Sequence, residues 1–329
     1  MDEICSDSAV DSRGAPFGGE IKSSTALSNR DSMIWIPGGR FLMGSNDFYR
    51  EERPVRRETV QGFWIDSHPV TNAQFRKFVG ATGYVTACER APDPAMYPDA
   101  DPSLLVPGSS VFRKPRGPVD LRDNRAWWEY VPGADWRHPE GPDSSVASRD
   151  DHPVVHVTYE DACAYAAWAG KELPFESEWE CAARGGLEGA TYAWGETFAP
   201  DGRPMANTWQ GRFPWENLRL DGYEGTSPVD AFPANGYGIY DMIGNVWEWT
   251  ASYFTPRVQS LKKSCCAPSE PDAHLARRVV KGGSHLCAPN YCLRYRPAAR
   301  QGEAVDTSTC HIGFRCIVRT PESRVALPA

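Results

Sequence analysis

Glycine and proline recur along the whole chain and interrupt nearly every apolar stretch. The 29 Gly and 28 Pro make up about 17% of the 329 residues, whereas their average combined usage is roughly 12%. Proline removes a backbone donor and glycine weakens the interior of a helix or strand, so long regular elements are excluded from most of the sequence. No motif repeats with a period of roughly 20–50 residues, which argues against a solenoid or a propeller. We therefore expect an irregular α+β fold in which a few short helices and many short strands are set among long ordered loops.

The composition is that of a globular protein with a large core. Hydrophobic residues make up 41% of the chain, which includes 12 Trp. The net charge is −8 and no long run of Lys or Arg occurs, so the sequence predicts no basic face for nucleic acid. Neither the apolar stretch of a secretory signal nor a run of about 18 apolar residues is present. We expect a cytoplasmic monomer that binds neither nucleic acid nor a membrane.

Most of the chain is expected to form one domain. Residues 1–32 are rich in Ser, Asp and Gly and predict a flexible N-terminal leader. No linker composition interrupts residues 33–320, which predict a single domain followed by a C-terminal tail at 321–329. Within that domain, residues 256–277 are interpreted as an exposed insertion.

Local patterns place the expected elements. Strands at residues 33–36 and 41–44, joined by Pro-Gly-Gly, predict a hairpin, and another short strand is expected at 63–66. Capping boxes at Thr71 and Thr158 predict helices near 71–80 and 158–170. A third helix is expected near 177–184, whereas residues 90–152 lack periodicity and predict long packed loops.

The ten cysteines are too sparse for a disulfide scaffold. In a reducing compartment free thiols or metal ligands are expected rather than structural disulfides. Cys287 and Cys292 are five positions apart, a spacing that separates side chains by about 140° on a helix and places them on opposite faces of a strand. The turn residues Pro289 and Asn290 between them would bring both sulfurs to one space.

Three interpretations of this pair remain open: unrelated buried thiols, a local or redox-active disulfide, and a metal site with two thiolates. Two soft thiolates suit Cu(I), whereas a structural zinc site requires four ligands. His285 is a candidate third ligand, although a core or surface histidine is the simpler interpretation. Arg294, Arg296 and Arg300, which follow the cysteines, are interpreted as ion-paired scaffold.

Two other segments are rich in oxygen ligands suited to a hard cation. One combines Asp241 and Glu248 with carbonyls that intervening glycines would expose, although taken alone a tight turn leading into an aromatic strand is the favoured interpretation. The other combines Asn207 and Thr208 with Asp221 and Tyr223. Phosphate-binding loops, His-Glu-x-x-His and Gly-x-Ser-x-Gly motifs are absent.

Several motifs together resemble the formylglycine-generating enzyme and sulfatase-modifying factor family. The scaffold motifs occur at residues 36–44 (IPGGRFLMG), 69–72 (PVTN), 152–157 (HPVVHV), 178–180 (EWE), 236–249 and 313–316 (GFRC). The scaffold motifs imply the family fold, a single-domain variant of the C-type-lectin-like architecture, rather than an activity. Ser284, Cys287, Tyr291 and Cys292 are placed as in true formylglycine-generating enzymes, and the match is to the prokaryotic type.

The resemblance implies an oxidase that uses O₂, a thiol reductant and Cu(I). Its substrate would be a cysteine within a Cys-x-Pro-x-Arg segment of an unfolded sulfatase, converted to Cα-formylglycine. Cys287 and Cys292 would hold Cu(I), and the substrate cysteine would join as a third sulfur. Ser284, Trp247 and Tyr291 would line the oxygen pocket, with Ser284 and Tyr291 donating hydrogen bonds to reduced oxygen.

The resemblance also implies two structural calcium sites. Asn207, Asp221 and the carbonyls of Thr208 and Tyr223 match one site. Asp241, Glu248 and the carbonyls of Gly244 and Val246 match the other.

Departures from the family pattern define the remaining expectations. Pro297 and Ala183 stand where the vertebrate-type enzyme has disulfide cysteines, and His311 replaces an Asn that precedes Leu-Gly-Phe-Arg. All eight cysteines other than Cys287 and Cys292 are expected to be free, and three of them have no counterpart that we can name: Cys265, Cys266 and Cys310.

Two alternatives remain on the same scaffold. An iron-dependent sulfoxide synthase would need a histidine cluster, and no His-x₃-His-x-Glu run occurs. In a non-enzymatic, lectin-like binding module, the cysteines would merely pair with each other.

Overall fold

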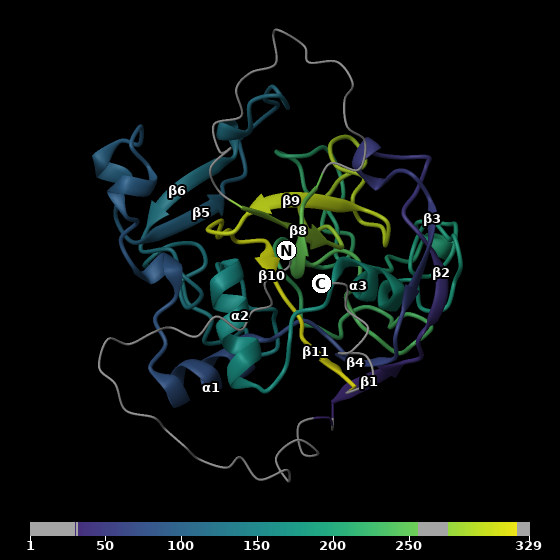
Figure 1. Cartoon of the computed structure of the whole chain (residues 1–329). Coiled ribbons are helices and arrows are strands. Elements are labelled where there is room, and N and C mark those ends of the chain that lie inside the picture. Colours follow the sequence, from purple (N-terminus) through teal and green to yellow (C-terminus); the bar gives the residue numbers. More distant parts are fainter. Residues whose placement is uncertain (1–29, 31, 256–275, 321–329) are drawn as a thin grey trace, which may run out of the picture.

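Short strands and helices are joined by long loops throughout the computed structural model (Figure 1), which describes residues 30, 32–255 and 276–320. The strands are β1 (Met33–Ile36), β2 (Gly39–Met43), β3 (Arg56–Val60), β4 (Phe63–Asp66), β5 (Gly108–Phe112), β6 (Trp128–Pro132), β7 (Trp247–Tyr253), β8 (Arg277–Lys281), β9 (Arg300–Ala304), β10 (Ile312–Gly313) and β11 (Ile317–Arg319). The α-helices are α1 (Asn72–Thr82), α2 (Tyr159–Trp168) and α3 (Glu176–Ala183). Single 3₁₀ turns occur at Arg50–Glu52, Ala87–Glu89, Pro94–Met96, Pro102–Leu104, Asn124–Ala126 and Pro200–Gly202. The irregular α+β fold is confirmed.

The predicted leader, tail and insertion lie almost entirely outside the described residues, so these three boundaries stay predictions. Within the described part of the chain, no helix is both long enough and apolar enough to cross a membrane.

Two sheets hold most of the strands. One has the order β1-β4-β11, and the other has the order β10-β7-β8-β9 with β10 parallel to β7. The predicted hairpin between residues 33–36 and 41–44 is wrong, because β1 pairs with β4 and β2 pairs with β3. A Cβ on Gly38 would lie 2.6 Å from the backbone nitrogen of Gly62. The connection from β1 to β2 therefore packs against the connection from β3 to β4. In both connections the chain passes between the β1–β4 sheet and the β2–β3 pair at this place.

The helices begin where the capping boxes predict. Thr71 and Gln74 exchange hydrogen bonds at the start of α1, and Thr158 and Asp161 do the same at the start of α2. Helix α1 continues through Gly80 and ends at Gly83, whose φ of 69° is left-handed. Helices α1 and α2 lie side by side at the lower left of Figure 1.

The segment expected to be only loops contains a pair of strands. β5 and β6 form an antiparallel ribbon at the upper left of Figure 1. An isolated parallel bridge joins Ser110 of β5 to Thr309, just before β10. This long-range contact brings the ribbon to the end of the four-stranded sheet, where the cavity described below lies.

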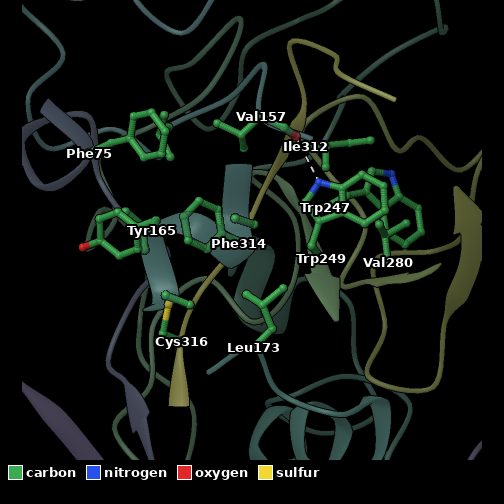
Figure 2. Packing of buried hydrophobic residues seen from close by; sticks show 14 of the residues in the cluster. Phe75, Val157, Tyr165, Leu173, Trp247, Trp249, Val280, Ile312, Phe314 and Cys316 are labelled. Atoms are coloured by element: carbon green, nitrogen blue, oxygen red, sulfur yellow. Dashed lines mark hydrogen bonds between the residues drawn. The ribbon is translucent and has the colours of Figure 1, made fainter. Parts of the chain in front are cut away.

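The largest hydrophobic cluster packs aromatic side chains from α1, α2 and β7 of the four-stranded sheet (Figure 2). Phe75 lies 5.9 Å from Tyr165, ring centroid to centroid, and Phe314 lies 5.3 Å from the same ring. Trp249 donates its indole N–H to the carbonyl of Val157 (3.0 Å; Figure 2). Cys287 and Cys292 belong to this same cluster, so the core itself fixes the predicted thiol pair.

Buried carboxylates and cations connect α3 with the neighbouring strands. Arg315 forms two hydrogen bonds of 2.7 Å with Glu248, and Glu180 accepts from Arg184 at 2.7 Å and from Lys281 at 2.9 Å. We call the following set the ion-pair layer: Glu176 with Arg300, Glu178 with Arg319, Glu180 with Arg184 and Lys281, and Glu248 with Arg315. Burial alone would raise the pKa of Glu180, but Lys281 and Arg184 lower it to about 2.

Among the described cysteines, one differs from expectation. Cys163 is disulfide-bonded, so the expectation that it is free is wrong. A disulfide depends on how closely the fold brings two Cα atoms together, which spacing along the sequence does not reveal. Cys88, Cys181, Cys310 and Cys316 are free as expected, whereas Cys5, Cys265 and Cys266 lie outside the described residues.

Candidate active site

The predicted thiol pair lies on a loop that folds back on itself, residues 282–296, which we call the thiol loop. Gly283 has a φ of 72°, and a Cβ there would lie 2.8 Å from the carbonyl oxygen of Arg294. Only glycine allows this close approach between the two ends of the loop. The backbone N–H groups of Tyr291 and Cys292 both donate to the carbonyl of Ala288, at 3.0 and 2.7 Å. This turn reverses the chain between the two cysteines.

The two sulfurs are 3.0 Å apart and both cysteines are buried. A disulfide bond would measure about 2.05 Å, so the pair is reduced. Burial raises the pKa of Cys287 well above its usual value, and the hydrogen bond from Cys287 lowers the pKa of Cys292 to about 7. Of the two coupled thiols, Cys292 is therefore the one that loses its proton first.

A cavity of about 470 Å³ opens against this pair, and we call it the thiol pocket. The structure brings all five predicted catalytic residues to its wall: Trp247, Ser284, Cys287, Tyr291 and Cys292. The other lining residues are Ser110, Asn124, Trp127, Trp128, Phe213, Leu286, Arg294, Gln301, Glu303, Thr309, His311 and Ile312. The pocket is thus built from β5, β6, β7, β9, β10, the thiol loop and the segments that carry Trp127 and Phe213.

Two hydroxyl groups of the pocket are placed to donate hydrogen bonds. Ser284 is fully buried, and its Oγ accepts from the backbone N–H of Leu286 at 3.2 Å, which leaves its hydrogen for a pocket ligand. Tyr291 is 41% exposed, and its ring stacks on Phe213 with a centroid distance of 4.5 Å. Partial burial raises the pKa of Tyr291, so its hydroxyl keeps its proton at neutral pH.

His311 lines the pocket as a neutral side chain. Its Nδ1 lies 2.6 Å from Thr309 Oγ1, and its ring lies 4.9 Å from that of Trp128. Burial lowers the pKa of His311 to about 3. The position that departs from the family pattern therefore contributes an uncharged imidazole to the pocket.

His285, the candidate third ligand, faces a different cavity. His285 and Cys310 line a separate space of about 500 Å³. His285 is held by the backbone carbonyl of Asn245 at 2.9 Å from its Nδ1, and the sulfur of Cys310 accepts from the N–H of Phe112. Neither side chain lines the thiol pocket, so the structure does not make His285 a third ligand beside the two sulfurs.

The donor set of the thiol pocket suits a soft ion. Two thiolates without further protein ligands favour Cu(I) over zinc, which takes four. Across residues 30, 32–255 and 276–320, no group of three or more His, Cys, Asp or Glu side chains is placed to hold a metal. The histidine cluster that an iron-dependent sulfoxide synthase would need is therefore not found in that part of the chain.

The first predicted calcium group is assembled around Asp221. Its Oδ1 accepts from the N–H of Tyr223 at 3.0 Å, and its Oδ2 accepts from Gln210 at 2.6 Å. The same Gln210 donates to the carbonyl of Thr208 at 2.9 Å. Asn207 donates to the carbonyl of Gly225 and is buried. The predicted oxygen ligands thus lie near one another, although hydrogen bonds already use several of them.

The second predicted group contains an uncompensated carboxylate. Asp241 is buried, its Oδ1 has no hydrogen-bond partner among the described residues, and burial raises its pKa to about 8. Glu248 is already bound by Arg315 and by the indole N–H of Trp179 at 2.7 Å. Counting lone pairs, only Oε1 of Glu248 retains an acceptor site. Asp241 therefore fits a cation site better than Glu248 does.

A close backbone approach joins the two calcium groups. A Cβ on Gly244 would lie 2.3 Å from the carbonyl oxygen of Asn207, so this position requires glycine. The side chain of Asn245 contacts both groups, at 3.5 Å from Asn207 Nδ2 and 3.3 Å from Asp241 Oδ2. Val246 follows in the same loop and is buried.

Sequence reasoning missed part of the pocket wall. Trp127, Trp128 and Phe213 were not singled out, because their segments lie far from the thiol loop in the chain. Glu303 on β9 follows the loop closely but belongs to no recognised motif. Arg294 was expected only as scaffold, and it does pair with Glu51 at 2.6 Å. Its side chain nevertheless lines the pocket.

Comparisons with known proteins identify the family to which this fold belongs. The family model described as "Sulfatase-modifying factor enzyme 1-like domain" matches residues 19–320. The chain is 57% identical to the formylglycine-generating enzyme of Mycobacterium tuberculosis, covering 87% of this chain and 97% of that protein. It is 46% identical to the formylglycine-generating enzyme of Mus musculus, covering 86% of this chain and 74% of that protein. The fold and the paired thiols thus define a sulfatase-modifying-factor-type protein, and the chain belongs to the formylglycine-generating enzyme family.

Two further matches show what family membership leaves open. The chain is also 40% identical to a Mus musculus protein named inactive Cα-formylglycine-generating enzyme 2, covering 87% of this chain and 85% of that protein. Among solved structures, PvdO from Pseudomonas aeruginosa matches with a TM-score of 0.58 at 24% identity, covering 88% of this chain and 94% of that one. The structural match shows the fold alone, so activity must be argued from the site.

Proposed function

We propose that this chain oxidises a cysteine in a Cys-x-Pro-x-Arg segment of an unfolded sulfatase to Cα-formylglycine. The oxidant would be O₂, a small thiol would supply reducing equivalents, and Cys287 and Cys292 would hold Cu(I). The observation that carries the proposal is the reduced thiol pair, 3.0 Å between sulfurs, on the wall of an open pocket. Family membership supports the same reaction.

The electron balance explains why a reductant is required. Conversion of a Cys side chain to an aldehyde, with the sulfur leaving as H₂S, releases two electrons. Reduction of O₂ to two water molecules consumes four electrons, and one of those waters in effect supplies the aldehyde oxygen. Two molecules of small thiol, oxidised to one disulfide, provide the other two electrons. When bound, Cu(I) would supply a one-electron path between thiolate sulfur and O₂.

The protein's own residues would bind and shield the reacting group. Cys287 and Cys292 supply soft ligands, and the cavity of about 470 Å³ accommodates the substrate cysteine and its flanking backbone. Trp127 and Trp247 are buried at the pocket wall and keep water from the sulfurs. Ser284 and Tyr291 would donate hydrogen bonds to oxygen as it is reduced, because each keeps its proton at neutral pH.

The reaction can be tested on a short Cys-x-Pro-x-Arg peptide. Wild-type protein given Cu(I), O₂ and a small thiol should produce the aldehyde, detected by mass spectrometry, and a Ser-x-Pro-x-Arg peptide should be unchanged. Cys287→Ser and Cys292→Ser should each abolish the product. Cys181→Ser is the matched control, because Cys181 is buried and free in α3 but does not line the thiol pocket. Absence of aldehyde with the wild-type protein would overturn the proposal.

We also propose that calcium stabilises the loops around Asp221 and Asp241. The unpaired, buried Oδ1 of Asp241 supports a cation there. Millimolar calcium should raise the melting temperature, and a chelator should lower it. Calcium at a hundredfold excess over its Kd should add about 2.7 kcal/mol to the free energy of unfolding. Asp241→Asn should remove most of this response, whereas no response in the wild-type protein would contradict the proposal.

Cytoplasmic location and a monomeric state complete the proposal. A reducing compartment would keep the thiol pair reduced, although the disulfide at Cys163 is more typical of an oxidising one. Cell fractionation tests the location, and light scattering tests the monomer.

A further inference from the structure

We infer that Arg294 is a positioning residue that compensates the negative charge gathered when a substrate thiolate joins Cys287 and Cys292. This inference rests on the proposed function for the identity of the incoming group. It assigns to one arginine, rather than to the pocket as a whole, the selection of a thiolate over a neutral side chain.

Arg294 is fixed from the segment that precedes β3. Its Nη2 donates to Oε1 of Glu51 at 2.6 Å, and its guanidinium carbon lies 3.9 Å from the ring centroid of Tyr49. The hydroxyl of Tyr49 accepts from the backbone N–H of Leu293 at 2.9 Å. Residues 49–51 therefore hold both the side chain of Arg294 and the backbone of the thiol loop next to it.

The guanidinium is not fully used by these contacts. Its Nε–H is buried and has no hydrogen-bond acceptor among the described residues. Arg294 faces the thiol pocket, and no other Lys or Arg in the described part of the chain lines that space. The one carboxylate on the described wall, Glu303, comes from β9. The charge of Arg294 is thus directed at the pocket rather than consumed by Glu51 alone.

A neighbouring arginine shows what a purely structural role looks like. Arg296 forms a buried two-point ion pair with Glu52, at 2.9 and 2.5 Å, and its guanidinium carbon lies 3.6 Å from the Phe48 ring centroid. Its side chain is 1% exposed, compared with 23% for that of Arg294. The same short segment therefore anchors both arginines, but only Arg294 reaches the pocket.

The negative charge that would gather in the thiol pocket explains why a cation is needed there. Cys287 and Cys292 lie 3.0 Å apart, and a third thiolate beside them adds like charge in a partly dehydrated space, where Coulomb repulsion is strong. An arginine does not lose its proton at any physiological pH, so the compensation is permanent. A neutral hydroxyl in place of the substrate thiol would gain nothing from it.

The test measures binding rather than turnover. The protein is loaded with Ag(I), a soft monovalent ion that suits thiolates and does not support the oxidation, and peptides of sequence Cys-x-Pro-x-Arg and Ser-x-Pro-x-Arg are titrated by calorimetry. Arg294→Met should weaken binding of the Cys peptide about tenfold or more, while the Ser peptide changes less than about twofold. Arg294→Lys should restore most of the selectivity, and Glu51→Gln should cause a smaller loss in the same direction.

Arg296→Lys is the matched control, because it retains charge but loses the two-point ion pair outside the pocket. It should lower the melting temperature and leave the Cys-to-Ser selectivity unchanged. Equal weakening of both peptides in Arg294→Met, no weakening of either, or wild-type protein that does not prefer the Cys peptide would each overturn the inference. The aldehyde assay is independent of this binding test. The two measurements together therefore distinguish a failure of the inference about Arg294 from a failure of the proposed oxidase function.

Discussion

The ion-pair layer and the thiol pocket both place charge in the protein interior, but only the layer is closed. Each carboxylate of the layer has a permanent cation within hydrogen-bond distance, as Glu248 has Arg315. In the thiol pocket, the charge of Arg294 lies near Cys292, which has Cys287 on one side and the open cavity on the other. Carboxylates that are each paired with a cation form a rigid support, whereas thiols beside an open cavity can still take a ligand. The two regions meet at β7, where Trp247 faces the pocket and Glu248 faces the layer.

Removing a cation from the ion-pair layer should have the largest effect on stability. Arg315→Met leaves the fully buried Glu248 with the indole N–H of Trp179 as its one hydrogen-bond donor among the described residues. Loss of one partner of a buried ion pair costs about 3–5 kcal/mol. Denaturant unfolding should show this loss. The double variant Arg315→Met with Glu248→Gln should recover part of it, because it removes the unpaired charge. A single variant as stable as the wild type would contradict the view that the layer depends on pairing.

His156 sharpens the comparison, because it is buried with no charged partner in hydrogen-bond contact among the described residues. Its Nε2 lies 2.8 Å from the carbonyl of Pro139, and its Nδ1 lies 2.7 Å from Ser109 Oγ. Burial lowers the pKa of His156 to about 4. The unfolded chain takes up this proton below about pH 6.5 and the folded protein does not, so stability should fall as the pH drops from 6.5 to 4.

The full contribution of His156 is about 3 kcal/mol. His156→Asn should reduce the loss of stability between pH 6.5 and 4, measured by denaturant unfolding at several pH values. The loss that remains includes the contributions of His285 and His311, whose pKa values burial also lowers. Asparagine is the suitable replacement because His156 has a φ of 59°, which asparagine tolerates. An unchanged slope would show that the imidazole is not held neutral by burial.

A substitution in the thiol pocket should reduce activity without reducing stability. Tyr291→Phe retains the stack on Phe213 and removes only a hydroxyl, so unfolding free energy should change by about 0.5 kcal/mol or less. Aldehyde formation should slow by a factor of about 10² if the hydroxyl donates a proton. A large stability loss with normal turnover would place Tyr291 with the structural residues.

Local signals in the sequence were sufficient for the helices and for the turn of the thiol loop. The capping boxes at Thr71 and Thr158 involve residues three positions apart, and the turn at residues 288–292 closes over five. Such contacts depend on the chain immediately around them, so pattern and spacing predict them well.

Contacts between distant segments were not predictable in the same way. Neither β5 nor β6 shows a regular alternation of buried and exposed residues, and the segment was interpreted as loop. Arg294 acquires its partner from Glu51, 243 residues earlier, and no spacing rule joins them. The proximity of the pocket residues from β5, β7 and β9 likewise follows from sheet pairing, which a single sequence does not specify.

The last strand of the described domain has a consequence for how the protein is made. β11 (Ile317–Arg319) pairs with β4, and Arg319 donates to Glu178 in α3. Both partners are synthesised more than a hundred residues earlier. A chain still emerging from the ribosome therefore has its first sheet one strand short, and Glu178 without Arg319, until nearly all of the domain has been translated. High-contact-order closure of this kind is slow, so truncation just before residue 317 should yield aggregation rather than a smaller folded protein.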